Sequence, residues 1–195
     1  MKKTAVICLI LVLSLSLAAA LAGCGGDKNK DTAKQYMREG DGYYEDAGVS
    51  WSDLEDKQTE LAGKAMQGDY SAFTGEAGAA LQKEIEKTLA DIVETLDSAS
   101  ASYKKITGLE GVEDYKEYAS KMIEAVKVRQ SMVGVVKALI KEMSDAFTAV
   151  AQGQDIDLIS MLMGSENMKK IDELSSDLQT LEKDAEKIKK DKKLE

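Results

Sequence analysis

The chain has 195 residues, in which 26 Lys and Arg stand against 35 Asp and Glu for a net charge of −9, and it contains neither histidine nor proline. So acidic a chain lacks the basic surface that binding to nucleic-acid phosphates requires. The absence of histidine removes the commonest general base and transition-metal ligand. Composition therefore argues against a nucleic-acid-binding protein and against most enzymes.

The N-terminal segment has the layout of an export signal. Lys2 and Lys3 are followed by an uncharged apolar run from Ala5 to about Ala20 and then by small residues. This order predicts a secretory signal peptide, and the run is short for a helix that spans a bilayer.

The four residues Leu21, Ala22, Gly23 and Cys24 that follow resemble the lipobox of bacterial lipoproteins. The resemblance implies cleavage before Cys24 and a diacylglyceryl group on its thiol, which would anchor the protein on the outer face of the cytoplasmic membrane or in an outer membrane. Two acyl chains suffice for stable anchoring. We therefore expect a signal peptide at 1–23, a lipidated tether at 24–30 and one helical domain at 31–195. The alternative is a secreted protein with a chance cysteine.

The first part of this domain keeps a helical period despite three glycines. Alternating steps of three and four residues connect Met37, Gly40, Tyr44, Ala47, Trp51, Leu54, Gln58, Leu61 and Ala65. Because a loop would usually shift the phase, we predict one helix over about 31–67, with an interruption near Gly48 as the alternative. Ser52 with Glu55 could cap a fresh start there.

Three further apolar stripes follow with the same spacing. The second contains Ile85, Leu89, Ile92, Leu96, Ala99, Tyr103 and Ile106; the third contains Val112, Tyr115, Ala119, Met122, Val126, Arg129, Val133, Val136, Ile140, Met143, Phe147 and Val150; the fourth contains Ile171, Leu174, Leu178, Leu181, Ala185 and Ile188. Breaks are expected at 68–75, 107–111 and 152–155, with a division of the last helix at Gly164 and Ser165 as an alternative. The sequence predicts an all-α, elongated up-down-up-down four-helix bundle with coiled-coil-like heptad packing.

Arg129 is the one charged side chain on the third stripe. An unpaired charge there would be costly, so we expect it to extend to solvent or to pair with a facing carboxylate; a ligand contact inside the bundle is the alternative. Cys8 leaves with the signal peptide and Cys24 is consumed by lipid, so no free thiol remains. We find no catalytic residue set, cofactor motif or metal site, and expect no enzyme activity.

Four antiparallel helices would bring the C-terminus back to the membrane. Basic residues gather at this anchored end, where they could face anionic headgroups or form an ordinary solvated tail: Lys28, Lys30, Lys34, Arg38, Lys104, Lys105, Lys187, Lys189, Lys190, Lys192 and Lys193. The far tip carries candidate residues for binding a partner, which could equally cap the bundle: Tyr70, Phe73, Leu158, Met161, Leu162 and Met163.

These features predict a non-catalytic, lipid-anchored helical lipoprotein of the cell envelope that serves as a protein-interaction or structural module. Its expected partners are the membrane, through lipid on Cys24, and another envelope protein, but not nucleic acid. The alternative is a lipoprotein that binds a small ligand or solute between its helices.

Overall fold

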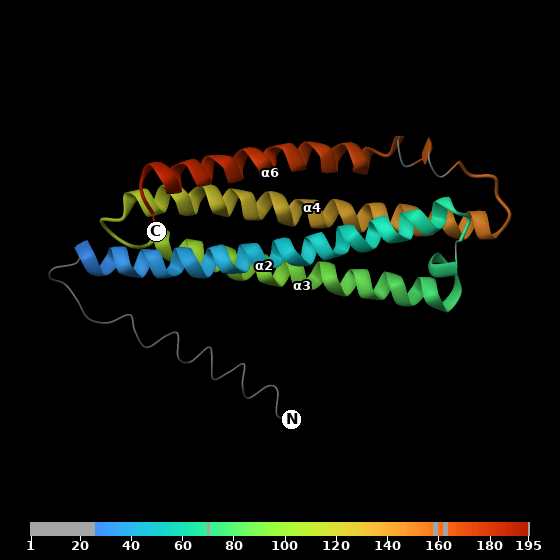
Figure 1. The fold of residues 1–195 in the computed structure, drawn as a ribbon, viewed down its shortest axis with the longest axis horizontal. Coiled ribbons are helices and arrows are strands. Elements are labelled where there is room, and N and C mark those ends of the chain that lie inside the picture. Colours follow the sequence, from blue (N-terminus) through green and yellow to red (C-terminus); the bar gives the residue numbers. More distant parts are fainter. Residues whose placement is uncertain (1–25, 70, 158–159, 162–163, 195) are drawn as a thin grey trace, which may run out of the picture.

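Four long antiparallel helices make up the structure, a computed structural model that describes residues 26–69, 71–157, 160–161 and 164–194 (Figure 1). They are α2 (Gly26–Met66), α3 (Gly75–Thr107), α4 (Glu113–Ala151) and α6 (Glu166–Asp191), with the short 3-10 helix η1 (Ser71–Phe73) between α2 and α3. The described residues contain no strand. The predicted all-α four-helix bundle is confirmed.

The two ends of the bundle hold different parts of the chain. The start of α2, the α3–α4 connection and the end of α6 lie at one end, which we call the proximal end. The 3-10 helix η1 and residues 152–157 lie at the other, the distal end (Figure 1). The predicted signal peptide, Cys24 and Gly25 fall outside the described residues. Within the described part, no helix is both long and apolar enough to cross a membrane.

α2 runs without interruption from Gly26 to Met66, so the alternative of a fresh start capped by Ser52 is wrong. The helix also begins earlier than predicted and includes most of the segment expected to be a tether. Two contacts hold this first part. The Thr32 hydroxyl donates to the Lys28 carbonyl at 2.9 Å, and the Asn29 side chain donates to the Glu110 carbonyl of the α3–α4 connection at 2.9 Å.

Two glycines of α2, Gly40 and Gly48, let side chains of neighbouring helices come close and do not break the helix. A Cβ atom on Gly40 would lie 2.6 Å from Cε1 of Tyr103 in α3, and one on Gly48 would lie 3.2 Å from the Arg129 guanidinium in α4. Both glycines lie on or beside the apolar stripe of α2. Their missing side chains leave room for Tyr103 and Arg129.

The core follows the predicted stripes. Its largest fully buried side chains come from α2, α3 and α4: Tyr103, Met37, Leu89, Ile92, Leu96, Ile106, Val126 and Val133. α6 adds Leu178 and Ala185. Beyond its end, Leu194 is buried because Lys193 adopts a left-handed backbone (φ 53°) and the Leu194 amide donates back to the Lys189 carbonyl at 2.9 Å.

The connection between the last two helices is longer than the predicted 152–155. α6 begins at Glu166, where Ser165 caps it by accepting a hydrogen bond from the Asn167 amide at 3.2 Å. Between α4 and this cap, the described residues with helical backbone are Ser160, Met161 and Gly164. The end of α4 therefore projects beyond the start of α6, and the connection covers it (Figure 1).

Candidate functional sites

One carboxylate, that of Asp41 in α2, is bonded to all three other helices. Its Oδ1 accepts hydrogen bonds from the Tyr103 hydroxyl of α3 at 2.9 Å and from the Tyr118 hydroxyl of α4 at 2.6 Å, and its Oδ2 pairs with Lys189 Nζ of α6 at 2.6 Å. The two tyrosine rings meet edge to face, with their centroids 6.2 Å apart. Four residues, one from each helix, thus form a single polar junction, which we call the Asp41 junction.

A second polar cluster surrounds Arg129, the charged residue of the third stripe. Its Nη2 donates to Glu182 Oε1 of α6 at 2.8 Å, and its Nη1 donates to the Tyr44 carbonyl of α2 at 3.1 Å. The guanidinium lies 4.0 Å from the centroid of the Tyr44 ring, whose hydroxyl donates to the same Glu182 oxygen at 2.6 Å. The arginine side chain is only 16% exposed, and Glu182 is the carboxylate that it faces.

Both clusters bridge the widest seam of the bundle. α2 packs closely against α3, and α4 packs closely against α3 and α6, whereas the backbones of α2 and α6 lie further apart. Long polar side chains from Asp41 to Lys189 and from Tyr44 to Glu182 close that gap. The seam between α2 and α6 is therefore held by hydrogen bonds and an ion pair between long side chains, whereas at the other seams the helices also pack closely.

Burial shifts the ionisation of the three tyrosines in these clusters. It raises the pKa of Tyr44, Tyr103 and Tyr118 well above the ordinary tyrosine value, because a phenolate would be poorly solvated there. The Asp41 charge raises the pKa of Tyr103 and Tyr118 further. At Tyr44 the Arg129 charge acts in the opposite direction, but burial dominates. All three hydroxyls are hydrogen-bond donors at neutral pH.

The polar groups of both clusters are mutually satisfied. Among the described residues, no buried side-chain nitrogen or oxygen lacks a hydrogen-bond partner, and no group of acidic or metal-binding side chains could hold a metal ion. Arg129 has its donors directed at Glu182 and the Tyr44 carbonyl. The hydrogen bonds and ion pairs of the two clusters therefore join the four helices in a fixed register.

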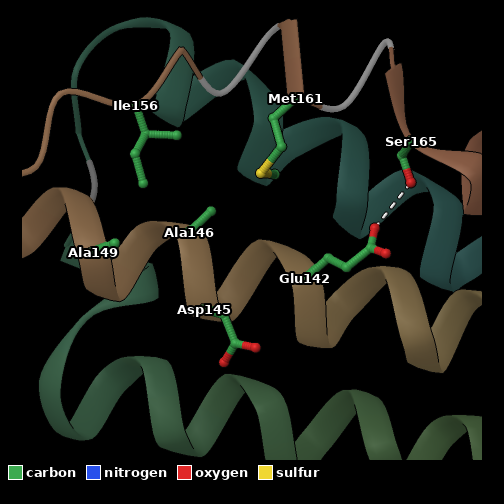
Figure 2. Close-up of a pocket in the computed structure, with 7 residues that line it drawn as sticks. All are labelled: Glu142, Asp145, Ala146, Ala149, Ile156, Met161 and Ser165. Atoms are coloured by element: carbon green, nitrogen blue, oxygen red, sulfur yellow. Dashed lines mark hydrogen bonds between the residues drawn. The ribbon is translucent and has the colours of Figure 1, made fainter.

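The distal end has a shallow hollow of about 470 Å³ where α4 extends beyond α6. Figure 2 shows Ile156 and Met161 reaching from the connection over Ala146 and Ala149 of α4. The Glu142 carboxylate accepts from the Ser165 hydroxyl at 2.9 Å, which ties the connection to α4 at the edge of the hollow.

The residues predicted for the distal tip are distributed over several places. Phe73 of η1 stacks on Phe147 of α4 with ring centroids 4.4 Å apart, so it helps to close the end of the core. Met161 lines the hollow and is half-buried. The other four predicted tip residues lie outside the described residues: Tyr70, Leu158, Leu162 and Met163.

Four residues of the polar clusters were not singled out from the sequence as partners of the core: Asp41, Tyr118, Glu182 and Lys189. Each is adjacent in the sequence to a residue of an apolar stripe, which is the one signal that could have marked them. Lys189 is predicted to be one of the basic residues of the anchored end, and in the structure it pairs with Asp41.

Comparison with known proteins adds no family to this description, because no family model, curated protein or solved structure matches the sequence.

Proposed function

We propose that this protein is a non-catalytic helical lipoprotein, held at the cell envelope by lipid on Cys24, whose bundle presents its distal end to a protein partner. The observation that carries the proposal is the sequence Leu21-Ala22-Gly23-Cys24 placed directly after a basic segment and an apolar run. Only Gly25 separates Cys24 from the first residue of α2, so lipid on that thiol would lie at the proximal end.

The described residues support a binding or structural role over catalysis. The polar side chains of the core are bonded to one another, and the most prominent candidate for ligand contact, Arg129, is bonded to Glu182 and Tyr44. A solute-binding role would need polar groups directed at an open site, and nothing at Arg129 favours that alternative. These contacts favour an interaction with a partner through the outer surface of the bundle over ligand binding between the helices.

The anchoring is tested by expressing the full chain in a bacterium with an alkyne-bearing fatty acid and analysing the N-terminal peptide by mass spectrometry. We expect a mature N-terminus at Cys24 that carries diacylglycerol, and loss of both label and cleavage in Cys24→Ala. The matched control is Cys8→Ala, which alters the only other cysteine and should leave lipidation intact. Cleavage at another residue, or label that persists in Cys24→Ala, would overturn the proposal.

The interaction role is tested with a photo-crosslinking amino acid placed in living cells. Gln152 at the distal end and Gln179 in the middle of α6 are both exposed glutamines. We expect discrete protein adducts from position 152 and none from position 179, with mass spectrometry naming the partner. Equal adduct patterns at the two positions would contradict a distal binding surface.

A further inference from the structure

Charge is distributed unevenly along the bundle. The segments that form the proximal end, residues 26–41, 100–121 and 183–194, contain 14 Lys and Arg and 11 Asp and Glu. The remainder of residues 26–194 contains 10 basic and 23 acidic residues. The proximal end is therefore slightly positive, whereas the rest of the bundle is strongly negative.

Ion pairs occupy some of the proximal lysines. Lys189 pairs with Asp41 at 2.6 Å, and Lys192 pairs with Asp114 at 2.9 Å. Lys105 lies 4.9 Å from the centroid of the Tyr36 ring. These side chains are engaged in holding helices together, so they are poor candidates for contact with a ligand.

Other proximal basic residues have no acidic partner within the described part of the chain. They are Lys28, Lys30, Lys34, Arg38, Lys104, Lys183, Lys187, Lys190 and Lys193. Except for the half-buried Lys34, all of them are exposed.

On α6 the sorting of charge follows the faces of the helix. Lys183, Lys187 and Lys190 are spaced by four and three residues on the side opposite the buried Ala185, beside Glu186. Asp184 instead lies near Lys121 of α4, at 3.6 Å. Helix packing thus directs one acidic residue toward a neighbouring helix and leaves three lysines on the outer face.

We propose that the proximal end of the bundle is a binding surface for anionic lipid headgroups, formed by the unpaired lysines at the start of α2 and the end of α6. Lysines close to an anionic bilayer are attracted to it, and the attraction decays within about 10 Å in physiological salt. Only the proximal end would be attracted at that range, while the acidic remainder would be repelled. The surface would hold the bundle with its distal end away from the bilayer. This inference relies on the proposed anchoring at Cys24 for the choice of the end that meets the membrane.

The test uses purified residues 24–195, which contain every helix of the described bundle, with one acyl chain attached chemically to the thiol of Cys24, the only cysteine in that segment. A single chain gives only marginal membrane binding, so a contribution from headgroups becomes measurable. Binding is compared between vesicles of phosphatidylcholine alone and vesicles that also contain phosphatidylglycerol. We expect binding at least about tenfold tighter to the anionic vesicles, and loss of the difference in high salt.

Two variants with the same net charge locate the surface. Four proximal lysines are changed in Lys28→Gln, Lys30→Gln, Lys187→Gln and Lys190→Gln, and four distant ones in Lys83→Gln, Lys127→Gln, Lys137→Gln and Lys170→Gln. All eight side chains are exposed and without a described ion pair, so both proteins should give the circular dichroism of the wild type. The variant with the four proximal changes should lose the preference for anionic vesicles. The variant with the four distant changes should keep that preference.

Equal binding of the wild type to both vesicles, or an equal loss in both variants, would overturn the proposal. Because the acyl chain is attached chemically, this result does not depend on whether cells lipidate Cys24. Failure of the surface and failure of the anchoring are therefore separate outcomes.

Discussion

The ring of Tyr103 occupies the space in which any residue other than glycine at position 40 would place its Cβ atom, with only 2.6 Å between that atom and Cε1 of the tyrosine. The contact fixes the approach of α3 to α2 at the level of the Asp41 junction. Tyr103 is fully buried and bonded to Asp41, so its ring has little freedom to move away.

Gly40→Ala should therefore destabilise the protein by about 1–3 kcal/mol, the usual cost of overpacking a core. The matched control is Gly42→Ala in the same helix, where a Cβ would meet nothing within 4 Å. Replacing that helical glycine should stabilise by about 0.5–1 kcal/mol. Urea unfolding followed by circular dichroism measures both changes in the free energy of unfolding. Changes of the same sign in the two variants would show that the Tyr103 ring moves aside to accommodate the added methyl group.

Arg129 and Glu182 should be energetically coupled, because each is the principal charge partner of the other. In a double-mutant cycle with Arg129→Met and Glu182→Met, we expect the two single changes together to cost about 1–3 kcal/mol more than the double variant. Arg129→Glu should destabilise the protein more than Arg129→Met, since it brings two carboxylates together. Additive free energies of unfolding would show that the pair does not join α4 to α6.

Stability should fall in alkaline solution because of the buried tyrosines. In the unfolded chain a tyrosine ionises near pH 10, whereas the pKa values of Tyr44, Tyr103 and Tyr118 are raised in the folded protein. Their contribution is thus complete below about pH 10 and is lost as the pH rises from there toward the folded-state pKa values.

Urea unfolding at increasing pH measures this loss. The double variant Tyr103→Phe with Tyr118→Phe should lose stability less steeply above pH 10 than the wild type, although it is less stable at neutral pH. Tyr43→Phe, at a tyrosine that is 43% exposed, serves as the control and should keep the wild-type slope. Identical slopes in all three proteins would contradict the assignment to the buried hydroxyls.

Ser165 should be important for the start of α6. Its hydroxyl oxygen accepts from the Asn167 amide at 3.2 Å and its hydroxyl donates to Glu142 at 2.9 Å. Ser165→Ala should cost about 1 kcal/mol, whereas Ser131→Ala at an exposed position within α4 should change stability by less than about 0.5 kcal/mol. Hydrogen exchange provides the local readout, and unchanged protection of the first turn of α6 in Ser165→Ala would argue against the cap.

Apolar spacing was sufficient to predict the helices, because a core residue is needed at every step of three or four along each of them. It even placed Gly40 in the stripe of α2, but it could not give the reason, which is the Tyr103 ring. The stripe also marked Arg129 as unusual. Its partner Glu182 was not predictable, since the side of α6 that faces Arg129 of α4 depends on how the helices are arranged around the core.

The connection before α6 shows a different limit. Ile156, Met161 and their neighbours are apolar enough to continue a helix, and the weak signals were Gly164 and the capping residue Ser165. In the structure Ile156 and Met161 lie over Ala146 and Ala149 of α4 and line the hollow there. This tertiary arrangement cannot be read from the local periodicity of the sequence.

The seam between α2 and α6 has a mechanical consequence. The bundle consists of two closely packed hairpins, α2 with α3 and α4 with α6, that meet through α3 and α4 and through the polar contacts of the seam. In the proposed anchored form, tension between the lipid and a partner at the distal end would act parallel to the helices. It would shear the hairpins past each other and load the Asp41 junction and the contacts of Tyr44 with Glu182 and Arg129 together, instead of breaking them one after the other. The bundle should therefore resist extension along its length better than splitting across it.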